Sequence, residues 1–333
     1  MKTSISPMLS EKIAQSALRS MLYEVAATPK PGLVDRANAG AHQDMDYFSF
    51  MASSSVLVFF FQECAQLGAK YAAEESLDLF PALREAGLRA EKEMFAATGG
   101  VNTHKGLVFS LGIISAAAAC CMTSEDRTTK LLDRICAKSG AITRGICERD
   151  FASVHLKERR TNGETLHLLH GFKGIRGEVE QGFPTVVEYA FPALNACRAQ
   201  RILDFNDSLV QVLMVLLSVT EDTNIAARCG KDAICEVRRF AREALDCGGM
   251  YTSEGRRMIH EMDRIFIERN VSPGGSADLL AVTIMFDLLE QMAPKYMGVE
   301  AARIGAQTAC SWSRLQLQTS KDTFSVSAEA LSN

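Results

Sequence analysis

Apolar segments with helical spacing recur along this chain, and each is bounded by residues that start or stop a helix. The boundaries follow one another at intervals of about 15 to 25 residues, a range that fits helices of globular proteins. The alternation of apolar and polar residues that marks a β-strand is hard to find. The pattern therefore predicts an all-α fold with functional loops at the helix ends.

Prolines, glycines and capping residues set the expected helix boundaries. Ser10, Asp46 and Ser276 are predicted N-caps of the first, second and last helices. Pro81 suits the first turn of the third helix, and Pro192 is expected to kink a later one. The predicted helices span residues 10–27, 46–68, 81–99, 105–122, 126–154, 185–200, 206–219, 231–247 and 253–269, and another follows residue 273.

No repeat or low-complexity linker separates these segments, which predicts a single helical domain over residues 10–292. Beyond it the hydrophobic periodicity fades, and Ser and Thr become frequent. Residues 293–333 are therefore expected to form a C-terminal extension whose end is loosely ordered.

Composition excludes several classes of protein. With 47% hydrophobic residues and a net charge of −4, the chain is globular and has no overall attraction for nucleic acid. The most apolar stretches, residues 47–61 and 107–122, are interrupted by serines and are shorter than the roughly 20 residues that span a bilayer. The 10 cysteines include no C-x-x-C pair and follow no secretory leader. We expect reduced thiols in a cytoplasmic protein that binds no membrane.

Polar loops that contain glycine are the expected functional regions, because loops on a rigid scaffold commonly carry binding residues. The first loop, residues 29–46, gathers the carboxylates of Asp35, Asp44 and Asp46, which suit Mg²⁺. It also contains Lys30, Arg36 and His42. The alternative is structural: Asp46 caps a helix, Asp35 pairs with a neighbouring cation, and His42 closes a turn.

The second loop, residues 99–106, opens an apolar helix. Lys105 and the backbone N–H groups at that helix start are suited to a phosphate, and His104 to positioning or protonating a base. A helix cap made by Asn102 or Thr103 would explain several of these residues without a ligand.

The third loop, residues 171–184, carries four glycines among charged residues, a composition not expected within a packed helix. Glu178 and Glu180 are candidate metal ligands or general bases. The alternative is a surface turn in which Arg176 pairs with a glutamate.

Two further polar segments lie at helix ends. Asp222 follows the apolar residues 209–219, where partial burial is expected to raise the pKa of its carboxyl, although it could equally cap the next helix. The turn through Gly274 and Gly275 opens the last helix and is either a second phosphate site or a simple cap.

Taken in order, these segments resemble the triphosphoribosyl-dephospho-CoA synthases that serve citrate lyase and, in a related branch, malonate decarboxylase. The resemblance covers residues 10–289. It departs from the family at Cys229, where a glycine is common, and in the 174–179 segment, which reads GIRGEV in place of GARGEA. The matching segments are PKPGLVDRANAGAHQDMD (29–46), GVNTHKG (100–106), GIRGEVEQGFP (174–184), DTN (222–224) and ERNVSPGGSADLL (268–280).

The resemblance implies that the 5-triphosphoribosyl group of ATP is transferred to the 2′-hydroxyl of 3′-dephospho-CoA, with release of adenine. It implies an α linkage formed from a β nucleotide, which favours one direct inverting displacement. Mg²⁺ is the expected cofactor, the product would pass to an acyl-carrier-protein prosthetic-group transferase, and a homodimer is allowed. The residues do not distinguish service to citrate lyase from service to malonate decarboxylase.

The roles expected from this resemblance fall into three groups. The catalytic candidates are Glu178, Glu180, Asp222 and His104. The substrate-binding candidates are Lys30, Arg36, His42, Asn102, Lys105, Arg176, Asn224, Gly274, Gly275 and Ser276. The metal-ligand candidates are Asp35, Asp44 and Asp46. Two rival functions are a Mg²⁺-dependent helical hydrolase of nucleotide or ADP-ribosyl substrates and a non-catalytic helical adaptor.

Overall fold

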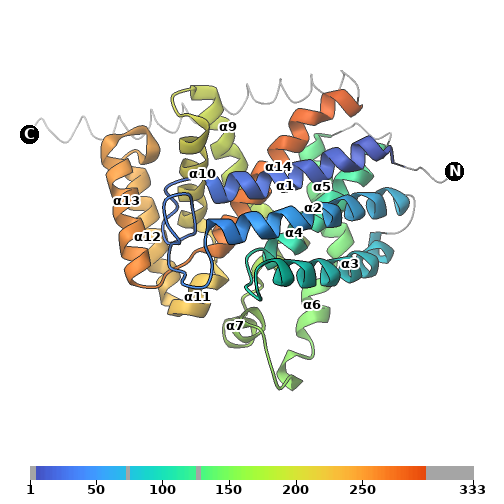
Figure 1. Ribbon diagram of the computed structural model, residues 1–333, viewed down its shortest axis with the longest axis horizontal. Helices are drawn as coiled ribbons and strands as arrows, with labels where there is room; N and C mark the ends of the chain where they lie inside the picture. Colours follow the sequence, from blue (N-terminus) through green and yellow to red (C-terminus); the bar gives the residue numbers. More distant parts are fainter. Residues whose placement is uncertain (1–4, 73–75, 125–128, 298–333) are drawn as a thin grey trace, which may run out of the picture.

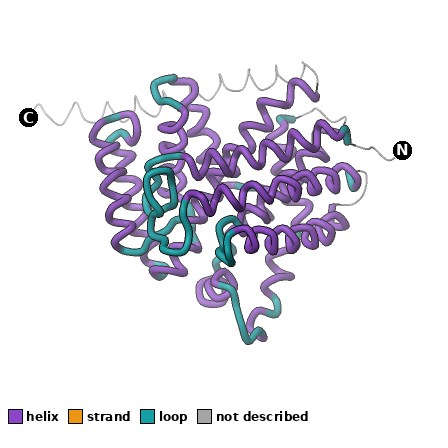
Figure 2. The backbone as a smooth tube through the Cα atoms, viewed as in Figure 1, coloured by secondary structure: helices purple, strands orange, loops and turns teal. Residues whose placement is uncertain are grey.

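The computed structural model describes residues 5–72, 76–124 and 129–297, and this part of the chain consists of helices and loops without a strand (Figures 1 and 2). The predicted all-α fold is confirmed. The longer helices are α1 (Pro7–Ala26), α2 (Tyr47–Lys70), α3 (Ser76–Ala97), α4 (Lys105–Thr123), α5 (Leu131–Thr143), α9 (Phe191–Gln200), α10 (Phe205–Val219), α12 (Asp232–Asp246), α13 (Ser253–Glu268) and α14 (Gly274–Met297). The shorter elements are α6 (Ile146–Phe151), η1 (Val154–Leu156), α7 (Asn162–His170), α8 (Gly174–Glu180), η2 (Val186–Ala190), α11 (Thr223–Cys229) and η3 (Gly249–Tyr251).

Helix α4 lies at the centre of the core. It packs against α1, α2, α3, α5 and α14, and nearly all of its side chains are buried. Small residues let its backbone approach α2 closely: a Cβ atom at Gly68 would lie 2.2 Å from the carbonyl oxygen of Ala116. The predicted core role of this apolar segment is confirmed.

Two described helices, α2 and α4, are long and apolar enough to cross a membrane by length and composition, and joining α10 to α11 across a 66° bend would add a third span. In the fold, 83% of the most apolar 18-residue stretch of α4 is buried, compared with 39% of the corresponding stretch of α2. The remainder of α2 faces outward and includes the exposed rings of Phe48 and Phe59.

A second group of helices extends the core on the other side of α14. Helix α10 packs against α12 and α14, and α13 packs against α12 at the edge of the molecule (Figure 1). The α6–α7 segment projects below α3 and α4, and the connection between α6 and α7 forms the lower edge of the molecule in this view (Figure 1). The starts of α4, α8, α11 and α14 lie at loops (Figure 2), as expected for functional segments.

Several predicted boundaries are confirmed and others are wrong. Asp46 caps α2 in a capping box with Ser49. Ser10, however, lies inside α1, which begins at Pro7. Pro81 lies inside α3 rather than in its first turn. Ser276 lies inside α14 rather than at its N-cap position.

The segment predicted as one helix over residues 126–154 is divided where Gly145 adopts a left-handed conformation with φ of 75°. A kink was predicted at Pro192. In the structure, Pro192 lies in the first turn of α9, and a turn of π-helix, η2, directly precedes it. Helix α14 continues to Met297, past the predicted domain end at residue 292. Residues 298–333, most of the predicted C-terminal extension, lie outside the described residues.

Candidate active site

A cavity of about 990 Å³ opens between α3, α4, α8 and the loops around α7, α11 and α14. This volume is at the upper end of the range for small-molecule sites, as two large substrates would require. The apolar lining residues, called the apolar part of the wall, include Phe60, Phe80, Phe95, Phe109, Ile113, Ile146 and Phe151. The polar lining residues, called the polar part, include Asn102, Lys105, Asp150, Arg160, Thr161, Lys173, Arg176, Glu178, Glu221, Thr223, Asn224 and Asp278. The two kinds meet where the Arg176 guanidinium lies over the Phe151 ring.

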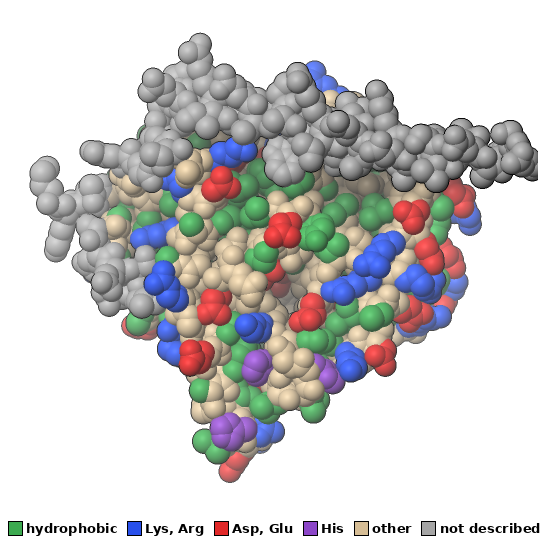
Figure 3. Space-filling view, turned by 180° about the vertical axis from the view of Figure 1, so that it is seen from behind, with side chains coloured by type: hydrophobic (Ala, Val, Ile, Leu, Met, Phe, Trp, Pro, Cys, Tyr) green, Lys and Arg blue, Asp and Glu red, His purple; other side chains and the backbone are tan. Residues whose placement is uncertain are grey.

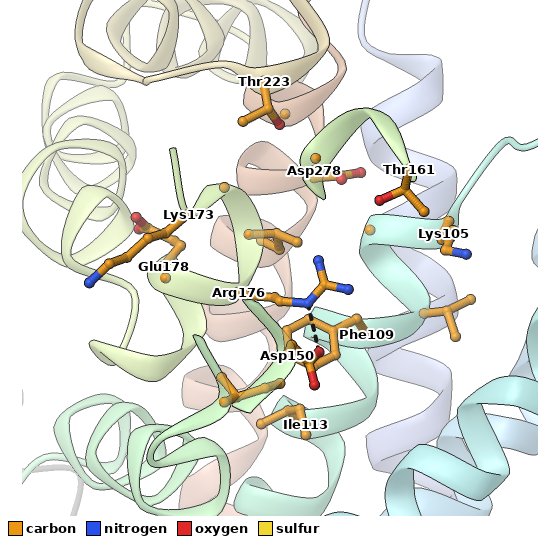
Figure 4. Close-up of a pocket in the computed structure, with 18 of the residues that line it drawn as sticks. Lys105, Phe109, Ile113, Asp150, Thr161, Lys173, Arg176, Glu178, Thr223 and Asp278 are labelled. Atoms are coloured by element: carbon orange, nitrogen blue, oxygen red, sulfur yellow. Dashed lines mark hydrogen bonds and ion pairs between the residues drawn. The ribbon is translucent and has the colours of Figure 1, made fainter. Parts of the chain in front are cut away.

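Arg176 is the best-anchored cation of the polar wall. Its Nε donates to Asp150 at 3.0 Å, and its guanidinium lies 5.6 Å from the centre of the Phe151 ring. Arg84 holds the other oxygen of Asp150 at 2.8 Å. Figure 4 shows the remaining nitrogens of Arg176 pointing into the open space of the cavity. The ion pair expected between Arg176 and a glutamate is therefore made with Asp150 instead.

The third loop contains helix α8, and the expectation that its glycines exclude a helix is wrong. Gly177 is buried where a Cβ atom would lie 2.5 Å from the Cβ of Lys173, so glycine is the residue that permits this packing. The glycines of the segment thus serve close contacts as well as turns.

Glu178 and Glu180 point to different sides of α8, as expected for residues two positions apart on a helix. Glu178 lines the cavity and accepts hydrogen bonds from the backbone N–H of Thr185 at 2.8 Å and from its hydroxyl at 3.0 Å. Burial raises the pKa of the Glu178 carboxyl. Glu180 accepts from the backbone N–H of Gly145 and does not line the cavity.

Three residues of the second loop line the cavity, and two of them, Asn102 and Lys105, have polar side chains. Asn102 accepts a hydrogen bond from the backbone N–H of Lys105 at 3.2 Å, so it caps the start of α4. The Lys105 ammonium lies 2.8 Å from a carboxylate oxygen of Glu91 and is about half exposed. A side chain in this position can turn toward an anionic ligand.

His104 lies behind the cavity wall. It is buried, its Nδ1 atom is hydrogen-bonded to the Ser53 hydroxyl, and its Nε2 atom has no hydrogen-bond partner among the described residues. Burial, with the positive charge of Lys30, lowers the pKa of His104 to about 3. The imidazole is therefore neutral near pH 7.

Asp222 is buried and has all its hydrogen-bonding capacity engaged by the starts of two helices. One carboxylate oxygen accepts from the backbone N–H groups of Asn224 and Ile225, and the other accepts from Ser276. Burial raises the pKa of its carboxyl despite these hydrogen bonds. The alternative that Asp222 caps the next helix is confirmed, and the side chain caps α14 as well.

The start of α14 contributes to the cavity through Gly275, and the start of α11 through Asn224. Gly274 packs against Asn224, since a Cβ atom there would lie 3.0 Å from its amide nitrogen. The backbone N–H of Ser276 already donates to Asp222. An anion at this helix start would therefore compete with a carboxylate of the protein.

The first loop lies outside the cavity, and its aspartates shape local structure. Asp35 accepts hydrogen bonds from the backbone N–H groups of Lys30, Ala37 and Asn38 at 3.0, 2.7 and 3.1 Å. Asp46 caps α2, which fits the structural alternative. Asp44 is exposed, with one oxygen 3.7 Å from Nδ1 of His42. In the described part of the chain, no group of three or more His, Cys, Asp or Glu side chains is placed to hold a metal ion.

The basic residues and the histidine of the first loop also have protein partners. Lys30 is buried and pairs with Glu24, not with Asp35. Arg36 donates to the amide oxygen of Asn206 at 2.9 Å. Nε2 of His42 is 2.8 Å from the hydroxyl of Ser272. The loop is therefore fastened to α1, α10 and the segment before α14.

Several cavity residues were not predicted from the sequence. Arg84 and Asp150 lie on different helices, and no local pattern connects them. Asp278 had a detectable signal, because it is a carboxylate within the otherwise apolar start of the last helix. Other unpredicted polar residues of the lining include Arg160, Thr161, Lys173 and Thr223.

Comparisons with known proteins agree with one another. A family model described as "CitG: ATP:dephospho-CoA triphosphoribosyl transferase" matches residues 10–296. A Lactiplantibacillus plantarum protein named "Probable 2-(5''-triphosphoribosyl)-3'-dephosphocoenzyme-A synthase" is 40% identical, over 83% of this chain and 96% of that protein. A Streptococcus pyogenes M49 protein of the same name is 37% identical, over 84% of this chain and 97% of its own length. "Protein CitXG" of Leuconostoc mesenteroides is 39% identical over 85% of this chain but only 60% of that protein.

Proposed function

The chain belongs to the ATP:dephospho-CoA triphosphoribosyl transferase family, and we propose that the cavity bounded by α3, α4, α8 and α14 is where it transfers the triphosphoribosyl group. The reaction joins C1′ of the ATP ribose to the 2′-hydroxyl of 3′-dephospho-CoA and releases adenine. The observation that carries this assignment is that one large cavity is lined both by basic side chains and by aromatic rings. Both substrates combine phosphate groups with apolar or aromatic groups.

The triphosphate binds to the polar part in this proposal. Arg176 is held by Asp150 with its remaining nitrogens facing the cavity, so little rotational entropy is lost when it meets a phosphate. Arg160 donates to the backbone carbonyls of Val154 and His155 and forms no ion pair within the described residues. Lys105 adds a third cation at the start of α4. On the face shown in Figure 3, acidic and basic side chains are interspersed and form no basic patch. The attraction for a triphosphate must therefore come from cations within the cavity.

The apolar part is suited to the adenine ring of ATP and the pantetheine arm of dephospho-CoA. Aromatic rings from α2, α3, α4 and α6 line it, including Phe60, Phe109 and Phe151. Stacking on such rings favours a flat base, and burial of the uncharged arm removes apolar surface from water.

Glu178 is the one predicted catalytic residue that lines the cavity. We assign it to stabilising the positive charge that develops on the ribose as the bond to adenine breaks. Thr185 orients its carboxylate. Asp222, Glu180 and His104 act indirectly in this proposal, by holding the helix starts and loops that form the wall. The displacement is direct and inverting, so no covalent intermediate on the protein is required.

We propose that Mg²⁺ binds with the triphosphate of ATP and not in the first loop. The carboxylates of Asp35 and Asp46 do not fit a metal site, because they accept backbone N–H groups of their own loop and helix start. Mg²⁺ commonly takes one or two protein carboxylates and completes its shell with phosphate oxygens and water. When bound, it would neutralise phosphate charge, and no step above depends on it.

The remaining assignments follow from the same proposal. The helical domain is taken to span residues 10–292, with residues 293–333 as its extension. The reaction takes place in the cytoplasm, which agrees with the free thiols of the nine cysteines that the structure describes. The product is passed to a prosthetic-group transferase that modifies an acyl carrier protein of citrate lyase or malonate decarboxylase. The exposed rings of Phe48 and Phe59 on α2 support a homodimer, which sedimentation analysis would test.

Incubation with ATP, with and without dephospho-CoA, tests the activity. We expect adenine release to require dephospho-CoA and to equal the amount of triphosphoribosyl-dephospho-CoA found by mass spectrometry. Adenine release that ignores dephospho-CoA would show a hydrolase, and no turnover of either substrate would favour an adaptor. Glu178→Gln is expected to slow turnover, whereas Asp44→Ala, a change at an exposed first-loop carboxylate, is expected to leave it unchanged.

A further inference from the structure

Asp278 places a carboxylate in the cavity wall that the proposed mechanism above does not use. It lies in the first turns of α14, and it lines the same cavity as Arg176, Thr161 and Lys105. Figure 4 shows its carboxylate, the guanidinium of Arg176 and the hydroxyl of Thr161 around a common open space. The side chain thus reaches the space in which the two substrates would meet.

The carboxylate of Asp278 forms no hydrogen bond or ion pair with any residue that the structure describes. Three other acidic groups of the cavity have partners: Asp150 pairs with two arginines, Glu178 accepts from Thr185, and Glu91 pairs with Lys105. Asp278 is partly buried in the wall, and a carboxylate that loses part of its hydration without gaining a partner is destabilised, which is common at functional sites.

Gly106 is the residue that makes room for this carboxylate. A Cβ atom at Gly106 would lie 1.9 Å from Oδ2 of Asp278, which is far closer than any allowed contact. Gly106 is the second residue of α4, and the helical backbone at this position does not itself require a glycine. The absence of a side chain at Gly106 therefore allows the Asp278 carboxylate to occupy its place in the wall.

The charged surroundings of Asp278 favour its protonated form. Burial is the largest cause that raises the pKa of its carboxyl well above its usual range, and the negative charges of Glu24 from α1 and Asp222 from the start of α11 add to it. On the α4 side, the cation is Lys105, which pairs with Glu91 of α3, and His104 is neutral. A raised pKa makes the ionised carboxylate a stronger proton acceptor.

We propose that Asp278 is the general base that accepts the proton of the attacking 2′-hydroxyl. This inference rests on the proposed function. The hydroxyl oxygen forms the new bond to C1′ of the ATP ribose, and its proton moves to the Asp278 carboxylate. The C1′–N9 bond breaks, and its electron pair leaves with adenine, which takes up a proton from water at N9. Asp278 returns its proton to water, so that one proton is moved in total from the hydroxyl to adenine.

The test compares Asp278→Asn with Asp287→Asn, an identical change in the same helix but outside the cavity, where Asp287 pairs with Arg198. Asp278→Asn is expected to lower kcat by about 10²- to 10⁴-fold, the usual contribution of a general base, with KM for both substrates nearly unchanged. It should also raise Tm, because an unpartnered and partly buried carboxylate is removed. Asp287→Asn should show the reverse, a lower Tm and unchanged kcat.

Two further measurements separate catalysis from structure. The acid limb of the wild-type pH profile of kcat/KM should be absent from Asp278→Asn, and Asp278→Glu should recover part of the activity. Gly106→Ala should lower kcat with residue 278 intact, because the added methyl displaces its carboxylate.

Three results would overturn the proposal. These are an Asp278→Asn variant with wild-type kcat, a slow one with lowered Tm and an unchanged acid limb, and one whose activity returns as Mg²⁺ is raised. The last would mean that the carboxylate binds metal. A wild-type protein that makes no triphosphoribosyl product would instead refute the proposed function itself. The incubation of wild type with ATP and dephospho-CoA tests this separately.

Discussion

The carboxylate of Asp222 accepts hydrogen bonds from both the backbone N–H and the hydroxyl of Ser276, at 2.7 and 3.0 Å. Through its other oxygen it caps α11, so one side chain joins the starts of two helices that lie far apart in the sequence. This contact fixes the relative positions of Asn224 on α11 and Gly275 on α14, which both line the cavity. The geometry of the polar wall therefore depends on a residue that does not itself line the cavity.

Replacement of Asp222 by alanine is expected to lower the free energy of unfolding by about 2 to 4 kcal/mol, because two helix caps are lost at about 1 to 2 kcal/mol each. Asp46→Ala is the matched control, since Asp46 caps one helix at an exposed position. It should cost about 1 kcal/mol. Urea denaturation of both variants measures the difference, and equal losses would mean that the second cap contributes nothing.

Replacement of Arg176 by alanine is expected to raise KM for ATP and lower kcat/KM by about tenfold to a hundredfold. A charge-assisted hydrogen bond to a phosphate contributes about 1.5 to 3 kcal/mol. The control is Arg257→Ala on the exposed face of α13, where the arginine pairs only with Glu254. Steady-state kinetics with varied ATP check the expectation, and wild-type KM in Arg176→Ala would place the triphosphate elsewhere.

His104 is expected to make the fold sensitive to acid. Its pKa is lowered from 6.5 to about 3 by burial and by Lys30, so the folded state favours the neutral ring. Stability from this group is complete above pH 6.5 and is lost as pH falls toward 3, at up to about 1.4 kcal/mol per pH unit. The difference in urea midpoint between wild type and His104→Asn should change below pH 6.5 and stay constant above it. A constant difference across the whole range would contradict a buried neutral histidine.

Two helical glycines should respond in opposite ways to alanine. Gly68→Ala places a Cβ atom 2.2 Å from the Ala116 carbonyl and should force α2 and α4 apart. A loss of about 2 kcal/mol or more is expected from overpacking. Gly87→Ala, in α3, meets only Val108 at 3.9 Å and should gain about 0.5 to 1 kcal/mol from helix propensity. Thermal denaturation distinguishes the two, and a stabilised Gly68→Ala would contradict the close α2–α4 contact.

The helical framework could be predicted because its signals are local. Asp46 caps α2 as its position before an apolar segment indicates, and the apolar residues of α4 form the centre of the core. Short helices were harder to predict: α8 forms within a glycine-rich segment, where Gly177 lies close to Lys173 one turn earlier. Local composition indicates a turn there, and the packing of α8 against α5 and α6 is absent from that local pattern.

The site was harder to predict than the fold because side chains that are neighbours in sequence diverge in space. Glu178 and Glu180 belong to one motif, yet only Glu178 lines the cavity. The acidic first loop has the composition of a metal site, but both carboxylate oxygens of Asp35 accept hydrogen bonds from backbone N–H groups. Asp150 on α6 and Arg84 on α3 are 66 residues apart in sequence, and no local pattern predicts that they meet.

A crystal structure of the chain with dephospho-CoA and an ATP analogue that resists loss of its base tests the central claim most directly. We predict triphosphate density against Arg176 and Lys105, with the base or the pantetheine arm among the rings of the apolar part. Triphosphate density at Asp35 and Asp44 in the first loop, with the cavity free of both substrates, would contradict the assignment of the cavity as the active site.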